Sequence, residues 1–368
     1  MNVVKIQRGS EMIIGYDARL IGTKRTGTVT MQQKLLEKLI VDNAHRWILF
    51  GDRDTIGKYE ETHANVKVIH VSMKIKPIWE QFILPYHIFN EKIDLFYSTK
   101  NFTVPFVYRH RTIATILDLI PFHFPENYLK NKLRFIYHHV LLKNALKARA
   151  VVTISEFSRN DVLAIKHIEN IHVIPLGPNA SSGSKEQNIR IHMKPFFLTI
   201  GGAEPRKNIQ SLLNAFSLFK EKGYPHKLVV VGQKNWRNDT LVVPPNIEKD
   251  IQFTGFVEDE ELYKLYQEAV CFIFPSMYEG FGLPVLEAIY AGLPAIVASN
   301  SSLEEIYSDS CFMVETMDPT SYVRAMEELS EKETYEINQV KYNEIKSRYN
   351  WDNSANELMK VLLKYSKR

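Results

Sequence analysis

Short apolar runs alternate with amphipathic stretches along the whole chain. Most runs are continuous in apolar character, which is typical of strands buried on both faces of a parallel sheet. The stretches between them have helical spacing: Leu35, Leu36 and Leu39 fall on one face of a helix predicted over 32–40. This alternation predicts an α/β protein with helices on both sides of parallel sheets. The predicted strands are 12–16, 46–50, 66–71, 94–97, 112–117, 150–154, 196–200, 227–231, 250–253, 270–274, 294–298 and 311–314.

The pattern breaks once, at the small and polar segment 178–184, which we interpret as a linker. Charge changes at the same place: residues 1–180 carry 25 Lys and Arg against 16 Asp and Glu, whereas residues 181–368 carry 21 against 26. We therefore expect domains at 1–178 and 179–350, and a terminal helix over 351–368 that packs back on the first. Two doubly wound domains would bring the carboxyl ends of both sheets to one cleft.

Composition narrows the class of protein. A chain of 368 residues with 45% hydrophobic and 24% charged residues is ordinary for a globular protein and excludes a disordered or fibrous chain. Its two cysteines, Cys271 and Cys311, lie in apolar runs, so we interpret them as buried thiols and not as a metal site or disulfide. We see no secretory signal and no apolar run of about 20 residues, so a cytoplasmic location is expected.

The segment 274–287 carries the strongest chemical signal. An apolar strand is followed by a loop with Gly280 and Gly282, and a helix then starts near Pro284. Glycines allow a ligand close to the backbone, and the start of a helix favours anions. Glu279 and Glu287 are eight residues apart and suit two separate hydroxyl-binding carboxylates beside a phosphate. The alternative is a solvated surface loop.

Two other loops also join a strand to a helix. In the first, the adjacent Arg206 and Lys207 could clamp a diphosphate, since cations are otherwise unfavourable at the start of a helix. The alternative there is a solvated helix start. In the second, 16–28, Gly27 could bring backbone amides near a phosphate, although a connecting loop fits nearly as well. No P-loop or dinucleotide fingerprint occurs, which weighs against P-loop NTPases and ordinary dehydrogenases.

The ordered set of motifs resembles the retaining GT-B glycosyltransferases of family 4 (glycosyl transferases group 1), related to bacterial mannosyltransferases. The resemblance extends from about Met12 to Trp351 and implies two Rossmann-like doubly wound domains facing each other across a cleft. Two glutamates separated by seven residues are the hallmark of that group. The matching pieces are Tyr16-Asp-Ala-Arg-Leu-Ile-Gly, Asp118-Leu-Ile-Pro, Ser155-Glu-Phe-Ser-Arg, Ile174-Pro-Leu-Gly, Glu204-Pro-Arg-Lys-Asn, Thr254-Gly-Phe-Val and Glu279-Gly-Phe-Gly-Leu-Pro-Val-Leu-Glu287.

The resemblance also implies roles for matching positions. Arg206 and Lys207 would hold the donor diphosphate, Glu279 would contact the donor sugar near the reacting carbon, and Glu287 would bind the ribose hydroxyls. The remaining donor-binding positions are Gly27 over the phosphate, the amides around Phe281, Gly282 and Leu283, and Val257 beside the base.

One position departs from the pattern. Many members have a histidine before the aspartate of the N-domain loop, whereas this chain has Leu117 before Asp118. Asp118 would then serve alone as a catalytic residue, or His123 would substitute for the histidine, although we favour a structural role for His123. Residues 52–54, Asp-Arg-Asp, superficially resemble a metal-binding motif, but we interpret them as a polar loop and expect no metal or other cofactor.

The stretch 128–149 combines six Lys and Arg with no acid and with an apolar stripe at Leu129, Leu133, Ile136, Val140 and Leu141. One interpretation is an ordinary amphipathic core helix with a solvated face. The other is peripheral attachment to an anionic membrane surface, at the inner face of the cell membrane.

Together these features predict a hexosyltransferase of cell-surface polysaccharide synthesis. It would move a mannose-, glucose- or GlcNAc-type sugar from a nucleotide-diphosphate sugar to a glycan or lipid-linked acceptor, with retention. The alternatives are a catalytically silent nucleotide-binding partner of a glycan assembly complex and a GT-B epimerase. A nucleic-acid-binding role has no motif to support it.

Overall fold

The computed structural model describes residues 11–23, 26–71, 76–128, 131–179, 195–236, 239–331 and 339–366. The chain divides into two compact units. Unit 1 comprises Met1–Leu176 and Trp351–Arg368, and unit 2 comprises Gly177–Asn350. The chain therefore leaves unit 1 just before Pro178, and its last helix returns to unit 1. Most of the predicted linker, from residue 180 onward, lies outside the described residues.

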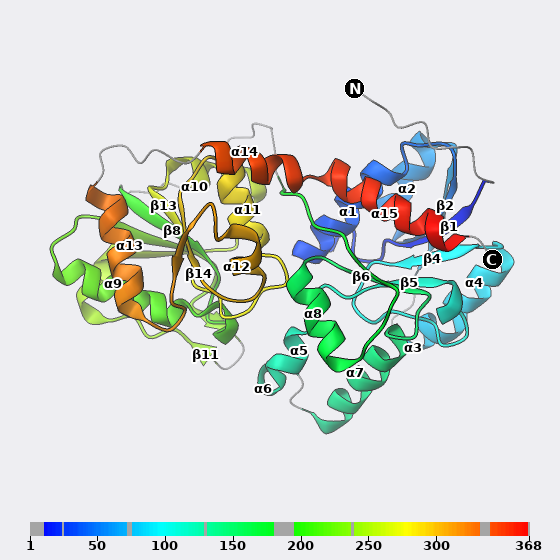
Figure 1. The fold of residues 1–368 in the computed structure, drawn as a ribbon, viewed down its shortest axis with the longest axis horizontal. Coiled ribbons are helices and arrows are strands. Elements are labelled where there is room, and N and C mark those ends of the chain that lie inside the picture. Colours follow the sequence, from blue (N-terminus) through cyan, green and yellow to red (C-terminus); the bar gives the residue numbers. More distant parts are fainter. Residues whose placement is uncertain are drawn as a thin grey trace. The chain divides into compact units, whose positions relative to one another are not determined.

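Unit 1 is built on a parallel sheet with the strand order β3-β2-β1-β4-β5-β6-β7 (Figure 1). Its strands are β1 (Ile13–Asp17), β2 (Arg46–Gly51), β3 (Val66–His70), β4 (Leu95–Ser98), β5 (Thr112–Thr115), β6 (Ala150–Thr153) and β7 (Ile171–Val173). Its helices are α1 (Gly27–Leu39), α2 (Arg53–Thr62), α3 (Lys76–Ile78), the π-helical η1 (Trp79–Ile83), α4 (Leu84–Asn90), η2 (Arg109–Arg111), α5 (Ile120–His123), α6 (Pro125–Tyr128), α7 (Lys132–Ala145), α8 (Glu156–Ile165) and α15 (Trp351–Ser366).

Helices cover both faces of this sheet because its strands are apolar on both sides. On one face, Ile48 and Phe96 pack with Leu84 of α4, while Ala114 packs with Leu142 of α7. The strand register places Phe96 and Ala114 on the same face, so α4 and α7 cover one side of the sheet. Helices α1 and α15 pack against each other within the unit.

Unit 2 repeats this plan with the order β12-β9-β8-β13-β14-β15. Its main strands are β8 (Phe196–Ile200), β9 (Lys227–Val231), β12 (Ile251–Gly255), β13 (Cys271–Phe274), β14 (Ala295–Ala298) and β15 (Phe312–Val314), beside a small antiparallel pair, β10 (Asn235–Trp236) and β11 (Asp239–Thr240). Its helices are η3 (Pro205–Lys207), α9 (Ile209–Glu221), η4 (Pro245–Asp250), α10 (Asp259–Glu268), α11 (Leu283–Tyr290), α12 (Ser301–Tyr307), α13 (Pro319–Glu331) and α14 (Gln339–Arg348).

Every predicted strand is present, with ends within two residues of those expected. The prediction missed β7, β10 and β11, which have only two or three residues each and lack a long apolar run. Both cysteines are free thiols; Cys271 is buried, as predicted, whereas Cys311 is only half-buried. Residues 52–54 are not a loop, since Asp52 caps the N-terminus of α2 and the next two residues begin that helix. No helix within the described ranges has the length and apolar character needed to cross a membrane.

In both units the strand order reverses beside the first strand. Successive strands of unit 1 are added outward from β1 to β3 on one side and from β4 to β7 on the other. In unit 2 the same reversal lies between β8 and β13. Ligands of doubly wound sheets bind beyond the carboxyl ends of the strands at this switch point. The loops after β1 and β4, and after β8 and β13, are therefore the places to look for a site.

Candidate functional site

The loop after β13 leads into α11 through a glycine. Gly282 caps the helix with φ +83°, a left-handed conformation that favours glycine, and a Cβ there would approach Cδ2 of Leu303 to 2.5 Å. The hydroxyl of Tyr307 donates to the Gly282 carbonyl at 3.0 Å and fixes the turn. Pro284 lies in the first turn of α11, as predicted. The first amides of a helix have no acceptor within it, so this end can receive an anion.

The loop after β8 bends back toward the same end of the sheet. It forms the single 3₁₀ turn η3, which ends at Asn208 in the left-handed region with φ 54°. The Asn208 side chain holds this conformation by donating to the Thr316 carbonyl at 3.0 Å. The amide of Met277 then donates to the Arg206 carbonyl at 2.8 Å. The two loops are thus joined directly, and Arg206 and Lys207 are brought to the β13 loop.

A compact ion cluster forms where the loops meet. One oxygen of Glu279, Oε1, accepts from Arg206 Nη1 at 2.6 Å, from Lys207 Nζ at 2.7 Å and from Ser276 Oγ at 2.7 Å. Burial alone would raise the pKa of Glu279, but the two cations lower it to about 2. Glu279 is therefore a carboxylate at neutral pH. Two adjacent cations near the start of a helix suggested a nearby anion. In this structure the carboxylate of Glu279 is that anion.

The two cations of the cluster are held differently. Arg206 also donates to the Tyr278 carbonyl at 2.8 Å and, through Nε, to Glu204 at 3.0 Å. Lys207 lies over the ring of Phe274 at 4.8 Å from its centroid, and burial lowers the pKa of its ammonium despite the attraction of Glu279. A buried lysine that shares one carboxylate oxygen with an arginine would gain from a further anion. The cluster suits a phosphate ligand.

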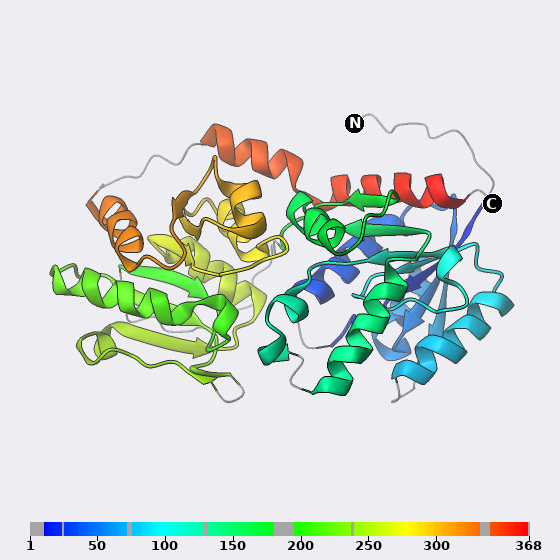
Figure 2. The same ribbon diagram turned by 60° about the horizontal axis from the view of Figure 1, so that its bottom comes forward.

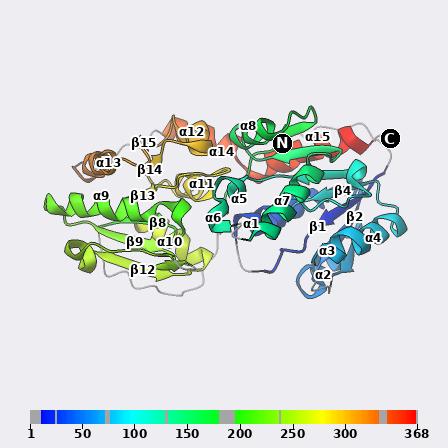
Figure 3. The same cartoon turned by 90° about the horizontal axis from the view of Figure 1, so that it is seen from below.

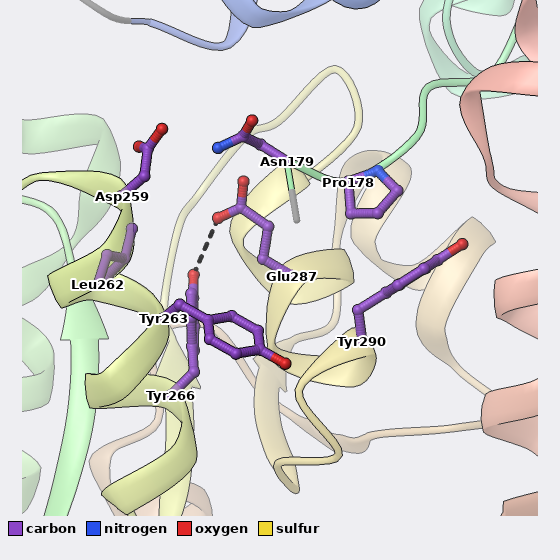
Figure 4. Close-up of a pocket in the computed structure, with 8 residues that line it drawn as sticks. All are labelled: Pro178, Asn179, Asp259, Leu262, Tyr263, Tyr266, Glu287 and Tyr290. Carbon is purple, nitrogen blue, oxygen red and sulfur yellow. Dashed lines mark hydrogen bonds between the residues drawn. The ribbon is translucent and has the colours of Figure 1, made fainter. Parts of the chain in front are cut away.

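Glu287 lies one turn inside α11 and lines a pocket within unit 2 (Figure 4). Its Oε2 accepts from the hydroxyl of Tyr266 at 3.2 Å, and the same hydroxyl lies 3.1 Å from the Pro284 carbonyl. Burial and the neighbouring Glu287 raise the pKa of the Tyr266 phenol, which therefore stays a donor. The pocket is lined by Pro178, Asn179, Asp259, Leu262, Tyr263, Tyr266, Glu287 and Tyr290.

Other residues predicted for the donor site contribute backbone rather than side chain. Phe281 is buried, with its ring edge-on to Tyr349 at 5.6 Å, so only its main chain could meet a ligand. Leu283 is the first residue of α11. Val257 is buried just after β12 and is not among the residues that line the pocket.

Two predicted residues belong to unit 1. Gly27 is the first residue of α1, which Thr26 caps. Asp118 closes its own loop, since its Oδ1 accepts from the Ile120 amide at 3.1 Å. His123 Nε2 is hydrogen-bonded to the Asp161 carboxylate at 2.8 Å, which ties α5 to α8 and fits the structural role favoured for it.

The sequence analysis missed several members of these sites. Ser276 lies within the motif that carries Glu279, yet nothing in the pattern singles it out. Tyr266 and Asp259 come from α10, whose amphipathic spacing predicts only a helix. In unit 1, Arg19 follows β1 and donates both to Asp17, the last residue of that strand, and to Glu80 of η1, 61 residues away. The described residues hold no group of three or more His, Cys, Asp or Glu arranged to bind a metal ion.

Comparison with protein families identifies the second half of the chain. Residues 183–356 match the family described as Glycosyl transferases group 1. Just under half of the chain is thus similar to the group 1 glycosyltransferases. The matched range contains the ion cluster, the N-terminus of α11 and Glu287 with most of the residues that line its pocket.

Characterised relatives extend the likeness into unit 1. The chain is 31% identical to O-antigen chain mannosyltransferase B of Escherichia coli over 240 residues, which are 61% of this chain and 62% of that protein. It is 26% identical to O-antigen chain mannosyltransferase RfbU of Salmonella typhimurium over 260 residues, 69% of each chain. The match to the Escherichia coli protein thus spans less than two thirds of that relative.

Solved structures share the fold of the whole chain. Sucrose-phosphate synthase of Thermosynechococcus elongatus superposes with a TM-score of 0.70 at 16% identity, covering 96% of this chain and 99% of that one. HepE of Anabaena, solved with UDP and glucose, gives 0.69 at 15% identity, covering 96% and 100%. With the two parallel sheets, this likeness confirms the predicted GT-B fold class of two Rossmann-like domains.

Proposed function

We propose that the protein is a retaining glycosyltransferase that moves a hexose, mannose in the first instance, from a nucleoside diphosphate sugar to a hydroxyl of a glycan or lipid-linked acceptor. The observation that carries the proposal is the convergence of Arg206 and Lys207 on Glu279 in the β13 loop, which leads into the N-terminus of α11. The two O-antigen mannosyltransferases support mannose and a role in cell-surface polysaccharide synthesis.

The leaving group explains the two cations. When the sugar–oxygen bond breaks, negative charge grows on the departing diphosphate. Fixed donors in a buried site stabilise such charge without reorganising. Arg206 is held by Tyr278 and Glu204 as well as by Glu279, so its guanidinium is already in place before the donor binds. Lys207 adds a second charge, and the amides at Gly282 and Leu283 add the helix N-terminus.

The carboxylates have different tasks in this scheme. Glu287 faces a pocket with three tyrosines, which suits the nucleoside, and a carboxylate is the usual partner of ribose hydroxyls. Glu279 keeps both cations at the loop and, through its second oxygen, contacts the donor sugar. The roles that the sequence resemblance implies for Gly27 and Asp118 of unit 1 stay predictions.

We further propose that transfer needs no metal ion and proceeds with retention. Two cations and a helix N-terminus can neutralise the diphosphate without a metal. The acceptor hydroxyl would attack on the face from which the diphosphate leaves, so its proton would pass to the departing phosphate oxygen. No pair of carboxylates at glycosidase spacing is then required. The reaction would take place in the cytoplasm, where nucleotide sugars are made.

The test is a panel of donors. GDP-mannose, UDP-glucose and UDP-GlcNAc are each added to the purified protein, and the unfolding temperature and the rate of nucleotide release are measured with and without EDTA. A true donor raises the unfolding temperature because it binds only the native state. The anomeric configuration of the product is then read by NMR. Absence of both stabilisation and nucleotide release for every nucleotide sugar would contradict the proposal, and an inverted product would contradict retention.

A further inference from the structure

Helix α7 exposes an apolar face in addition to the one it buries. Leu141 and Leu142, near its C-terminal end, pack into the core of unit 1. Leu133, Ile136 and Val140, spaced three and four residues apart, are instead solvent-exposed, Leu133 to 75%. The sequence predicted one apolar stripe from Leu129 to Leu141, of which Leu129 lies outside the described residues. The structure separates Leu141 from the exposed set, which packing among the described residues does not explain.

A second helical segment of unit 1 also has apolar side chains exposed to solvent. In the continuous run α3–η1–α4, Trp79, Leu84 and Ile88 are buried against the sheet. Phe82 and Phe89, on the same run, are 71% and 72% exposed, and Tyr86 between them is also exposed. A cluster of solvent-exposed aromatic side chains is typical of a surface that binds a protein or a membrane.

The two helical segments are neighbours. Both cover the same face of the seven-stranded sheet, and Figures 2 and 3 show them on one side of unit 1. They meet at Val104, whose carbonyl accepts from Gln81 of η1 at 3.3 Å and from Asn144 of α7 at 2.7 Å. Phe106 and Val107, in the loop that follows, are exposed as well. We call the outward side chains the two-helix surface: Phe82, Tyr86, Phe89, Leu133, Ile136 and Val140.

Charge beside this surface identifies the partner. Residues 131–149 contain no Asp or Glu, and Lys132, Arg134, Lys143 and Lys147 are all exposed. A soluble polyanion would pair with the cations, but the aromatic and aliphatic side chains would stay exposed to water. An anionic lipid bilayer satisfies both, because apolar side chains insert at the boundary between headgroups and acyl chains while cations stay among the phosphates.

We propose that the two-helix surface of unit 1 seats the protein on an anionic lipid bilayer, with the aromatic and aliphatic side chains inserted and the cations of α7 among the headgroups. The proposal stands independently of the transfer reaction, since it concerns unit 1 and needs no donor. If both hold, a lipid-linked acceptor would be met at the bilayer surface.

The test is cosedimentation of the full chain with vesicles of phosphatidylcholine alone or with 30% phosphatidylglycerol. We expect binding to the anionic vesicles that falls with salt. The variants Phe82→Ser/Phe89→Ser and Leu133→Ser/Ile136→Ser should each lower the partition coefficient by about tenfold or more, as expected for losing two buried apolar side chains. The variant Lys132→Gln/Arg134→Gln should bind more weakly at low salt and similarly at high salt.

The matched control is Val41→Ser/Val242→Ser, which removes two exposed apolar side chains elsewhere. It should bind as the wild type does. Thermal unfolding and stabilisation by the donor show that each variant is folded, which separates failure here from failure of the proposed function. Binding unchanged in both apolar variants would overturn the proposal. So would competition by soluble glycerol phosphate, which would indicate a phosphate site, or a wild-type dimer that the serine variants dissociate, which would indicate a self-interface.

Discussion

The two switch points of the molecule hold ion clusters that are built differently. In unit 1, beyond β1, one cation lies between two carboxylates: Arg19 donates through Nε and Nη2 to Asp17 at 2.7 and 2.8 Å and through Nη1 to Glu80 at 3.2 Å. In unit 2, beyond β8 and β13, one carboxylate oxygen of Glu279 lies between two cations. The same position in the same topology thus carries an excess of carboxylate in unit 1, whereas in unit 2 the two cations are balanced by Glu279 and by Glu204, which pairs with Arg206.

The difference fits a structural role for the unit 1 cluster and the ligand-binding role proposed above for the unit 2 cluster. The guanidinium of Arg19 forms a forked pair with Asp17 and lies over the ring of Trp79 at 4.1 Å from its centroid. Its donors are thus taken up within unit 1, where they link the β1 loop to η1. In unit 2 the two cations share one carboxylate oxygen, and the buried Lys207, whose pKa burial lowers, would gain from a further anion. A shared fold position therefore does not decide the chemistry; the local residues do.

The largest expected effect is on stability, in unit 1. The variant Arg19→Ala leaves Asp17 and Glu80 buried without their counter-ion, and breaking a buried ion pair from one side costs about 3–5 kcal/mol. The free energy of unfolding, measured by urea denaturation, should fall by that amount. The control is Arg53→Ala, which removes an exposed pair with Glu60 and should cost less than about 1 kcal/mol. Equal small losses in both would show that the unit 1 cluster is not structural.

The corresponding change in unit 2 should affect turnover and not the fold. The variant Lys207→Ala leaves Glu279 paired with Arg206 but removes one charge from the departing diphosphate. Loss of one such stabilising donor lowers kcat by about 10²–10³-fold. The control is Lys227→Ala in the same unit, whose partner Asp250 keeps Lys220. A folded Lys207→Ala protein with normal kcat would place the leaving group elsewhere.

The sequence predicted the unit 2 cluster better than the unit 1 cluster, and spacing explains why. Glu279, Gly282, Pro284 and Glu287 lie within one strand-to-helix loop, so a short window contains the glycine turn, the helix start and both carboxylates. The long strands could also be predicted, because a strand that is buried on both faces has an uninterrupted run of apolar residues. The chain could therefore be assigned to its fold class before any contact was known.

The remaining features depend on contacts between distant residues. Glu80 meets Arg19 only because η1 crosses the end of β1, and no periodicity marks that carboxylate as buried. Likewise, the apolar residues of α7 have helical spacing, but spacing alone does not tell that Leu133 faces water while Leu142 faces the core. That Glu279 pairs with Arg206 and Lys207, 73 and 72 residues away, also emerged only from the folded loops.

A smaller effect is expected at the pocket beside the unit 2 cluster. The variant Glu287→Gln keeps the shape of the side chain but removes the charge that would hold the ribose hydroxyls. Hydrogen bonds to a charged group contribute about 1.5–3 kcal/mol, so the Kd of the nucleoside diphosphate should rise at least about tenfold. Isothermal titration gives the Kd directly. Tyr266→Phe removes only the neighbouring hydroxyl and should change it less; a larger effect from Tyr266→Phe would assign the contact to the tyrosine.

The smallest expected effect is on the pH dependence of kcat. It distinguishes the two clusters because one holds an arginine only and the other also holds a lysine. The carboxylates around Arg19 raise the pKa of its guanidinium, so the cation of the unit 1 cluster stays charged across the pH range of an activity assay. Burial lowers the pKa of Lys207 below its usual 10.5, and a cation with a lowered pKa is lost as the pH rises through that value.

We therefore expect kcat to fall on the alkaline side, below the pH at which an ordinary lysine would titrate. Glu279, with its pKa of about 2, should give no acidic limb above pH 4. In Lys207→Arg, whose guanidinium stays charged, the alkaline limb should move upward even if the maximal kcat is lower. Ionisation of the substrate affects the wild type and Lys207→Arg equally, so it does not contribute to the difference between their pH profiles at saturating donor. An alkaline limb at the same pH in both proteins would show that Lys207 is not the group that titrates.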